Sequence, residues 1–483
     1  MKHVARKSFF FSGMLIANIF GGALAATIIV NPGQSIQTAV NSAVAGDIVQ
    51  VKAGTYNQKI LISGKNGNAD NFITIKGDAG AVITGAGLVP AGREGLISIK
   101  NSSYIKIDGF EIANFTYNGS NTPVGILVTG YGSNIQILGN KIHDIKNTST
   151  CKDPCPVGAH GLAVFGTHAN GITDLLLKKN EVYDNVLQAS EALVVNGNVD
   201  RFEVLNNDVH GNNNIGFDFI GYENECASCG ENDRARNGIV RGNTATNNSS
   251  VKNPWYDGQG SAAGFYVDGG RYIVFERNIA TGNDIGFEFA SEHVGKATED
   301  IMMMNNFVFN NREAGLSVGG YSSSTGGSRR INVHNNSFYK NKGWGTEITF
   351  QFKVTYSNFS NNIIFGKGSA DESYDNSGSG HSQNVWGKNL WWGISTESSN
   401  LPGIRIVADP KYVSAATGNL SIQSTSPAID VGAVSANITG WTSPIWLRYF
   451  SSNGIPPNGE VDFNGHARVQ NTIDLGAVEY QSL

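Results

Sequence analysis

Three carboxylates lie on neighbouring sequence segments, two of them at matching positions, and could perform acid–base chemistry or bind a cation. Asp218 lies in Gly-Phe-Asp-Phe, Glu288 lies in Gly-Phe-Glu-Phe, and Asp268 lies two residues beyond Tyr266 in Gly-Phe-Tyr-Val-Asp. In an alternating strand the large apolar residues point inward, so the residue between them points outward. Acids gathered on one outer face repel one another, which raises the pKa of at least one of them or recruits a cation.

The spacing of stacked strands predicts how far apart these residues lie. Neighbouring coils lie about 4.8 Å apart, and two residues along a strand cover about 6.8 Å. Asp218 and Glu288 are then expected on the order of 10 Å apart between Cα atoms, with Asp268 about 8 Å from each. Tyr266 is expected between Asp218 and Glu288. These four residues form the predicted centre of the site.

Long segments beside these strands carry further candidates. They span residues 223–237, 249–262 and 291–296, and long loops on one side of a solenoid usually build its binding face. The catalytic candidates are Asp218, Asp268, Glu288, His293 and Lys296, and the substrate-binding candidates are Glu223, Arg234, Tyr256, Tyr266 and Glu292.

Two reactions fit these residue types. In β-elimination, Asp218, Asp268 and Glu288 hold Ca²⁺, which neutralises a uronate carboxylate and acidifies the neighbouring C–H, and a base such as His293 or Lys296 removes the proton. In hydrolysis, one carboxyl protonates the glycosidic oxygen and another activates water. A third hypothesis is a surface protein that binds carbohydrate without cleaving it.

The elements that must position these residues follow from an internal repeat. A turn Asn followed by alternating apolar residues returns every 26 to 40 residues or so, a period typical of solenoids. Stacked Asn side chains can form hydrogen-bonded ladders along such a coil. The repeated residues are Asn140, Asn180, Asn207, Asn243, Asn278, Asn306, Asn336 and Asn362.

A second column of alternating strands repeats in register with the first. Its outward residues are Ala163, Val194, Asp218, Tyr266, Glu288, Ser317 and Glu347. Seven such strands in register predict an all-β chain, folded as a right-handed parallel β-helix.

The ends of the chain predict how the solenoid is closed. The segment from Pro32 to Gln37 begins a short amphipathic helix that can cover the first coil, since terminal coils must be capped. The repeat fades after about residue 370. We therefore expect a signal peptide at 1–25, the β-helix at 26–370, and C-terminal coils with a packed tail at 371–483.

The N-terminus indicates export. Lys2, Arg6 and Lys7 precede an apolar run, and Ala23-Leu24-Ala25 offers a small-x-small cleavage site. The expected protein is secreted or periplasmic, monomeric, and free of the membrane once the signal is removed. The formal net charge of −5 and the lack of a Lys/Arg run argue against a nucleic-acid partner.

Four cysteines occur as two close pairs, Cys151/Cys155 and Cys226/Cys229. Export favours disulfides, for which three connectivities are possible. A four-thiolate zinc site is the alternative, because CxxxC and CxxC spacings suit tetrahedral zinc.

The chain resembles the pectin-lyase-like superfamily of parallel β-helix proteins over nearly the whole mature sequence. The features that carry the resemblance are the N-terminal segment that begins with Pro32–Gln37, the Asn-turn coils, and the tail Asp474-Leu-Gly-Ala-Val-Glu-Tyr. That superfamily includes polysaccharide lyases, hydrolases, epimerases and non-catalytic surface proteins. The chain lacks the epimerase motif Asp-Pro-His, the polygalacturonase pattern Asn-Thr-Asp and a run of aspartates that would bind Ca²⁺. The resemblance implies a polysaccharide as the partner, and slightly favours a lyase acting on a uronate-containing polymer, with Ca²⁺ as the cofactor.

Overall fold

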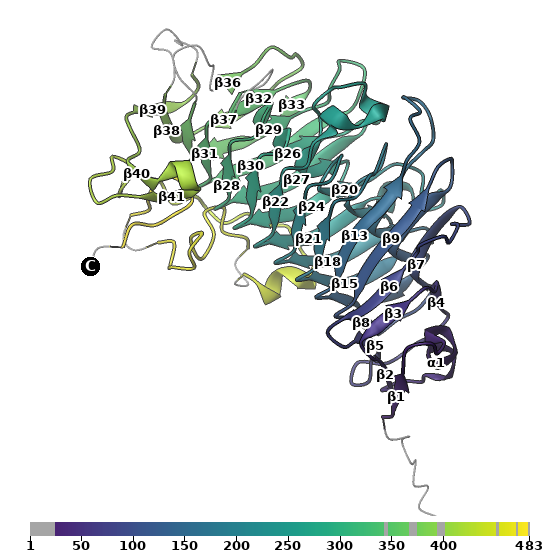
Figure 1. Ribbon diagram of the computed structural model, residues 1–483. Helices are drawn as coiled ribbons and strands as arrows, with labels where there is room; N and C mark the ends of the chain where they lie inside the picture. Colours follow the sequence, from purple (N-terminus) through teal and green to yellow (C-terminus); the bar gives the residue numbers. More distant parts are fainter. Residues whose placement is uncertain are drawn as a thin grey trace, which may run out of the picture.

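The computed structural model describes residues 25–341, 346–366, 374–393, 401–450, 454–469 and 472–481. Apart from Ala25, the expected signal segment lies outside these ranges. The chain winds into a long solenoid whose coils stack side by side (Figure 1). Among the described residues, no helix is long and apolar enough to cross a membrane.

Three long sheets, called A, B and C here, run along the solenoid, and their strands pair in parallel. Sheet A contains β1 (Thr27–Val30), β2 (Ile48–Val51), β5 (Ile73–Gly77), β8 (Ile105–Asp108), β12 (Ile135–Leu138), β15 (Ile172–Lys178), β18 (Val199–Leu205), β21 (Ala235–Arg241), β24 (Arg271–Glu276), β27 (Ala297–Met304), β30 (Gly327–His334), β34 (Asn358–Ser360) and β37 (Val385–Trp386), with β11 (Gly132–Ser133) and β33 (Val354–Thr355) at its side.

Sheet B lies next to sheet A along each coil. It contains β3 (Gly54–Tyr56), β6 (Ala81–Thr84), β9 (Glu111–Tyr117), β13 (Lys141–Asn147), β16 (Glu181–Tyr183), β19 (Asp208–His210), β22 (Thr244–Thr246), β25 (Ile279–Thr281), β28 (Phe307–Phe309), β31 (Ser337–Tyr339), β35 (Ile363–Phe365), β38 (Lys388–Trp392) and β39 (Ile404–Val407).

Sheet C carries the outward acids Asp218, Asp268 and Glu288. It contains β4 (Ile60–Ser63), β7 (Arg93–Lys100), β10 (Thr122–Thr129), β14 (His160–Gly166), β17 (Leu193–Gly197), β20 (Phe217–Ile220), β23 (Ala263–Asp268), β26 (Ile285–Ala290), β29 (Ala314–Val318), β32 (Ile348–Phe350) and β36 (Tyr374–Asp375). The predicted all-β parallel β-helix is confirmed.

The interior is filled by the inward residues of the three sheets. Phe217, Phe265 and Phe287 stack ring on ring on successive coils, with centroids 4.7 Å apart in each pair. All three rings are fully buried. Since burying one such side chain contributes roughly 1.5–3 kcal/mol, the repeated apolar columns are the main stabilising term of the solenoid.

The predicted asparagine ladder is present. In each step an Asn side-chain N–H donates to the side-chain oxygen of the Asn on the next coil, as from Asn207 to Asn243 and from Asn243 to Asn278, at 3.0 and 3.1 Å. The same oxygen also accepts a backbone N–H. The ladder continues past the expected members to Asn389.

A second ladder was not predicted. It joins Asn185, Asn212, Asn248, Asn283, Asn311 and Asn341. At its end the carboxylate of Glu347 accepts the backbone and side-chain N–H groups of Asn341. Glu347 was expected beside Ser317, in line with Asp218, Tyr266 and Glu288. That prediction is wrong, because Thr349 pairs with Ser317.

The two ends of the solenoid are closed differently. Helix α1 (Ile36–Ser42) buries Ile36, Ala39 and Val40 against the first coil, and its N-terminus is capped by the Ser35 side chain. At the other end the parallel coils continue beyond residue 370 to β39. The tail then forms an antiparallel pair, β40 (Tyr412–Ser414) with β41 (Asn419–Ile422), and packs along the coils. Its 3₁₀ helices are η4 (Ala415–Thr417) and η5 (Pro444–Arg448).

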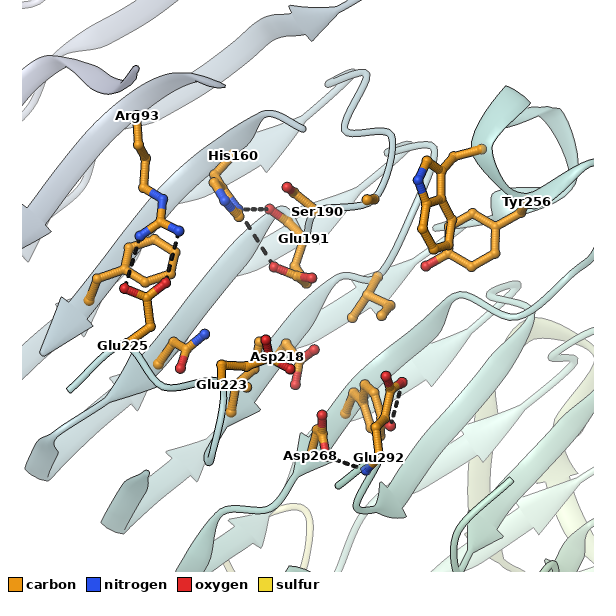
Figure 2. A pocket seen from close by; sticks show the side chains of 17 residues that line it. Arg93, His160, Ser190, Glu191, Asp218, Glu223, Glu225, Tyr256, Asp268 and Glu292 are labelled. Carbon is orange, nitrogen blue, oxygen red and sulfur yellow. Dashed lines mark hydrogen bonds and ion pairs between the residues drawn. The ribbon is translucent and has the colours of Figure 1, made fainter. Parts of the chain in front are cut away.

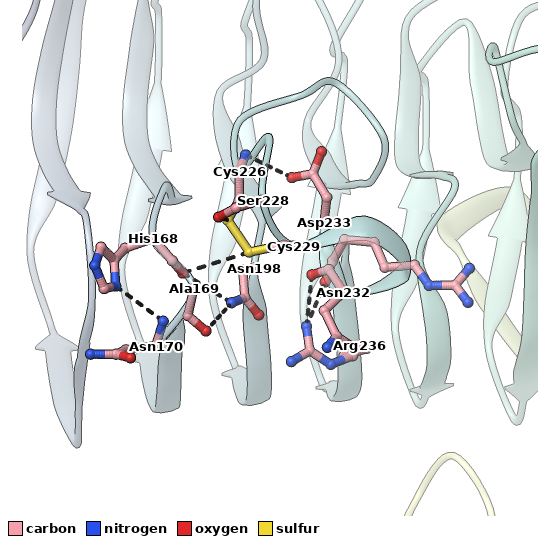
Figure 3. The surroundings of a disulfide bond; sticks show 11 residues. His168, Ala169, Asn170, Asn198, Cys226, Ser228, Cys229, Asn232, Asp233 and Arg236 are labelled. Carbon is pink, nitrogen blue, oxygen red and sulfur yellow. Dashed lines mark hydrogen bonds between the residues drawn. A yellow bond between two sulfur atoms is a disulfide. The ribbon is translucent and has the colours of Figure 1, made fainter.

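The cysteines form two local disulfides, Cys151–Cys155 and Cys226–Cys229, so the zinc alternative is wrong. Figure 3 shows the second disulfide in the loop after β20, above the turn at His168. This loop includes the 3₁₀ helix η1 (Gly230–Asn232), and the Cys226 backbone N–H donates to Asp233 at 2.9 Å. The loop is thereby folded back against the outer face.

The first ladder yields a stability prediction. Asn243→Ala removes the acceptor of two N–H groups of Asn207. We expect a loss of about 2–4 kcal/mol in the free energy of unfolding, because both donors stay buried without a partner. Urea denaturation measures it. Asn118→Ala, at an exposed loop position, is the control and should stay within about 0.5 kcal/mol of the native chain. Equal stability of Asn243→Ala and the native chain would contradict the structural role of the ladder.

Candidate active site

A pocket of about 350 Å³ opens on the outer face of sheet C, where the long loops meet the strands (Figure 2). Its floor comes from β14, β17, β20 and β23, and its walls come from the loops that follow β20 and β26 and from the 3₁₀ helix η3 (Pro254–Tyr256). A further 3₁₀ helix, η2 (Ser250–Lys252), precedes η3. Six carboxylates line the pocket: Glu191, Asp218, Glu223, Glu225, Asp268 and Glu292.

The register of sheet C places the central residues as the sequence predicted. Asp218 pairs with Tyr266, and Tyr266 pairs with Glu288, so the three lie on successive coils. Asp268 lies two residues beyond Tyr266 and opposite Ala290. Asp218, Tyr266 and Asp268 line the pocket, whereas Glu288 lies one coil outside it.

Two carboxyls at the pocket floor are buried without a neutralising partner. Asp218 is 2% exposed, and its Oδ1 accepts no hydrogen bond from any described residue. Burial and the charges of Glu191 and Asp268 raise the pKa of Asp218 well above its usual range. Asp268 is 4% exposed, and burial followed by the charge of Glu292 raises its pKa likewise. In both cases the protonated form is favoured relative to an exposed carboxyl.

Glu191 lies at the entrance to β17 beside a buried histidine. Burial raises the pKa of Glu191 to about 8. His160 Nδ1 lies 3.0 Å from the backbone oxygen of Glu191 and 3.6 Å from its carboxylate. Burial and the nearby Arg93 charge lower the pKa of His160 to about 3, so its ring is neutral. A carbonyl only accepts, so Nδ1 carries the proton and donates it.

The loop residues of the pocket are held by hydrogen bonds. The Glu292 backbone N–H donates to Asp268 Oδ1 at 2.8 Å, and the Tyr266 hydroxyl donates to Glu292 Oε1 at 3.3 Å. On the opposite wall, the Tyr256 hydroxyl accepts from Asn214 at 3.1 Å. These contacts fix two phenol rings and one carboxylate around the acids.

Positive charge in the pocket is confined to its edge. Arg93 makes two parallel hydrogen bonds to Glu225, at 2.8 and 3.2 Å, and its guanidinium lies 3.7 Å from the centre of the Phe165 ring. Among the described residues that line the pocket there is one arginine, Arg93, and no lysine. Because Arg93 is paired with Glu225, the other five carboxylates have no arginine or lysine partner in that lining.

Besides Glu288, the predicted residues Lys296 and Arg234 also lie outside the pocket. Lys296 donates to Glu231 at 2.8 Å and lies over the Tyr222 ring. Arg234 is buried and donates to Glu299 at 2.7 Å, where it belongs to a charged network on sheet A. Neither side chain lines the pocket, because Glu231 and Glu299 hold them elsewhere.

His293 lies at the rim and is part of a possible cation site. Its Nε2 lies 3.0 Å from Glu223 Oε1, and ligand atoms of His293, Glu223 and Asp268 lie within 4.8 Å of one another. Of the predicted metal ligands Asp218, Asp268 and Glu288, only Asp268 belongs to this group. The oxygen-rich surroundings, including the unbonded Oδ1 of Asp218, fit a hard cation such as Ca²⁺.

Several pocket residues escaped the sequence-based prediction, chiefly Glu191, Arg93 and Glu225. His160 and Glu191 occupy matching positions, each two residues before the paired residues Leu162 and Leu193. A comparison of the residues two positions before Leu162 and Leu193 would have identified His160 and Glu191 from the sequence. Arg93 and Glu225 lie 132 residues apart in the chain, and no local pattern connects them.

Comparisons with known proteins were made for the whole chain. No protein-family model matches it. It is 34% identical over 422 residues to the uncharacterised protein YwoF of Bacillus subtilis (strain 168), which covers 82% of this chain and 88% of YwoF.

Solved structures with similar folds include the pectate lyase Pel9A, with 16% identity, a TM-score of 0.49, and coverage of 95% of this chain and 98% of that chain. Another is an alginate lyase from Paenibacillus sp. str. FPU-7, with 12% identity, a TM-score of 0.45, and coverage of 77% and 99%.

The relationship to YwoF spans most of both chains, and the three parallel sheets define the architecture independently of any comparison. The chain therefore belongs to the family of YwoF, and its fold is a parallel β-helix.

Proposed function

We propose that this chain is a secreted enzyme that cleaves a polysaccharide by acid–base catalysis between the buried carboxyls on sheet C. The observation that carries the proposal is the cluster of Glu191, Asp218 and Asp268, whose pKa values are all raised in a pocket without a free arginine or lysine among its described lining residues. Glycoside hydrolysis is the reaction that needs such a set, since it requires one protonated and one ionised carboxyl.

Glu191 is the proposed general acid. With a pKa of about 8 its carboxyl holds a proton at neutral pH and can give it to the glycosidic oxygen. His160 positions Glu191 by donating to its backbone oxygen. The neutral ring of His160 adds no charge that would pull the proton from the acid.

Asp218 and Asp268 are the proposed source of the base. Two interacting carboxyls lose their protons in separate steps, so the pair can hold one negative charge over a wide pH range. The one that ionises first activates a water at the sugar carbon. The Asp268 carboxylate already accepts the Glu292 backbone N–H, which favours its charged form.

The pocket walls suit a sugar ring. Trp255 and Tyr256 pack edge to face with centroids 4.9 Å apart, and the Trp255 indole N–H donates to the Cys155 backbone oxygen. Aromatic rings held in this way offer a flat apolar surface beside polar groups, as the two faces of a pyranose require.

β-Elimination on a uronate polymer is the second candidate, and the group of Glu223, Asp268 and His293 favours it. Glu223 and Asp268 would hold Ca²⁺, which when bound supplies the positive charge that a uronate carboxylate needs. The sequence slightly favoured this reaction. We rank hydrolysis first because two of the bases that elimination would use, Lys296 and Arg234, are paired outside the pocket, and His293 remains beside the acids.

Replacing the proposed acid tests the site. Glu191→Gln should lower the release of reducing ends from the cleaved polymer by at least about 10²-fold, the usual contribution of a general acid. Pectate, alginate, xylan and galactan are screened with the native chain first, with and without Ca²⁺.

Glu288→Gln is the comparison variant for that experiment. Its carboxyl has a pKa raised to about 8 by burial, like that of Glu191, but it lies outside the pocket, so the variant should retain most of the activity. Formation of an unsaturated product that absorbs in the ultraviolet, and its loss when Ca²⁺ is chelated, would show that the reaction is β-elimination and not hydrolysis. No cleavage of any polymer would reject both reactions.

The pH dependence of cleavage follows from the same carboxyl. Because Glu191 must be protonated to act, the turnover rate should fall as the pH rises through about 8. Initial rates measured from pH 5 to pH 10 on the best polymer would show the decline. A rate that stays level to pH 10 would exclude Glu191 as the acid.

The stability of the folded chain should show the cost of these buried acids. Folding raises the pKa of Glu191 from 4.5, its value in an unfolded chain, to about 8. Between these two pH values the folded chain binds one proton that the unfolded chain has lost, so the free energy of unfolding falls as the pH rises. Glu191→Gln removes this loss and should raise the melting temperature at pH 8 by at least about 2 °C, with a smaller gain at pH 5. If the difference in melting temperature between variant and native chain is the same at pH 5 and pH 8, Glu191 does not bind this proton in the folded state.

A further inference from the structure

A second pocket, of about 370 Å³, lies on sheet A beneath the C-terminal tail, on a different sheet from the acidic pocket. It is lined by Tyr272, Asp300, Arg330, Asn332, Tyr356 and residues 438–441. A pocket of this size suits a ligand as large as a sugar unit.

The floor of this pocket is a row of residues on successive coils. By the register of β24, β27, β30 and β33, Tyr272 lies beside Asp300, Asp300 beside Arg330, and Arg330 beside Tyr356. Three coil steps separate the two tyrosines, a span of about 14 Å. An aromatic ring therefore lies at each end of a charged centre.

The charged centre is rigid. Arg330 donates through Nε and Nη2 to both oxygens of Asp300, at 2.6 and 2.8 Å, and Arg271 donates to Asp300 at 2.9 Å. A second acid, Glu299, accepts from Arg330 at 2.7 Å. These ion pairs fix the Arg330 and Asp300 heads, so hydroxyl groups of a ligand would meet donors and acceptors that are already in place.

The tail supplies the third aromatic ring. Trp441 packs on Tyr272 with centroids 5.2 Å apart and on Trp446 with centroids 4.9 Å apart. Trp446 is 4% exposed in a small apolar cluster with Ile445, Phe450 and Ile455 from the tail and Met302 from sheet A. Trp441 is thereby held at the pocket edge by a buried anchor.

Tyr356 has no comparable packing reason. Its side chain is 62% exposed at the pocket rim, three coils from the Tyr272–Trp441 pair. A large ring left in solvent at the rim, opposite a partly exposed Tyr272–Trp441 pair and beside a polar centre, is typical of a surface that binds a ligand with apolar and hydroxylated faces.

We propose that this pocket is a second, non-catalytic carbohydrate-binding site, in which Tyr272, Trp441 and Tyr356 stack on pyranose rings while Arg330, Asp300 and Asn332 bind their hydroxyl groups. It holds a polysaccharide on sheet A, away from the acids of sheet C. The chemistry recognised is the pyranose ring itself, whether the polymer is neutral or carries uronates.

Native gels that contain pectate, alginate, xylan or galactan test this site. All variants carry Glu191→Gln, so that cleavage of the polymer during the run is slowed equally in each. Tyr356→Ala and Asn332→Ala should each weaken the retardation of the chain by a bound polymer, Tyr356→Ala by about fivefold to tenfold in apparent affinity. Tyr321→Ala is the matched control, because that side chain is 60% exposed but lies outside the pocket, and its retardation should not change.

The set of polymers that retard the chain shows whether neutral or uronate-containing glycans are bound. Unchanged melting temperatures of Tyr356→Ala and Asn332→Ala would show that their losses are not due to unfolding. The site is refuted if no polymer retards the chain, or if Tyr356→Ala migrates like Tyr321→Ala on every polymer that does. Both readings are independent of catalysis, so a failure of the proposed reaction would leave this result interpretable.

Discussion

The stacking of one coil on the next is the interaction on which every other feature of this protein depends. Backbone hydrogen bonds of the parallel sheets and the two asparagine ladders hold neighbouring coils at the fixed spacing of a β-sheet. The side chains of the first ladder are fully or almost fully buried and bonded at both ends, so the coils cannot slip without breaking several bonds at once. This rigid frame leaves the outer faces free to carry residues that do not contribute to folding.

The same frame forces like charges together on sheet C. Asp218 and Asp268 lie on adjacent coils, and Glu191 lies at the entrance to the strand before them. Among the described residues that line the pocket, the only arginine, Arg93, is paired with Glu225, and none is a lysine. An isolated pair of such acids would move apart or recruit a cationic partner. Here the strands prevent separation, so protonation of a carboxyl, or a cation bound at the group of Glu223, Asp268 and His293, would lower the repulsion. On sheet A an acid is neutralised by cations instead. Glu299 accepts hydrogen bonds from Arg234, Arg329 and Arg330, and its pKa is lowered to about 2.

The fold could be predicted almost completely from the sequence, because the repeat sets the ladder, the strands and the inward residues. The central residues Asp218, Tyr266 and Asp268 could be placed for the same reason, since their neighbours follow from the register. The loops could not be predicted. Lys296 and Arg234 find their partners through the conformation of the segment after β20, and Arg93 meets Glu225 from a coil far back in the chain. Glu347 was misplaced because the segment before β32 departs from the repeat and turns its carboxylate to Asn341.

In the proposed mechanism, the carboxyl of Glu191 in the sheet C pocket keeps its proton at neutral pH and serves as the acid. Infrared difference spectra between the native chain and Glu191→Gln at pH 7 measure this directly. The mechanism predicts that the native chain shows the carbonyl band of a protonated carboxyl, which is missing in the variant and fades in the native chain as the pH rises through about 8. A difference spectrum with only the bands of an ionised carboxylate at pH 7 would contradict it.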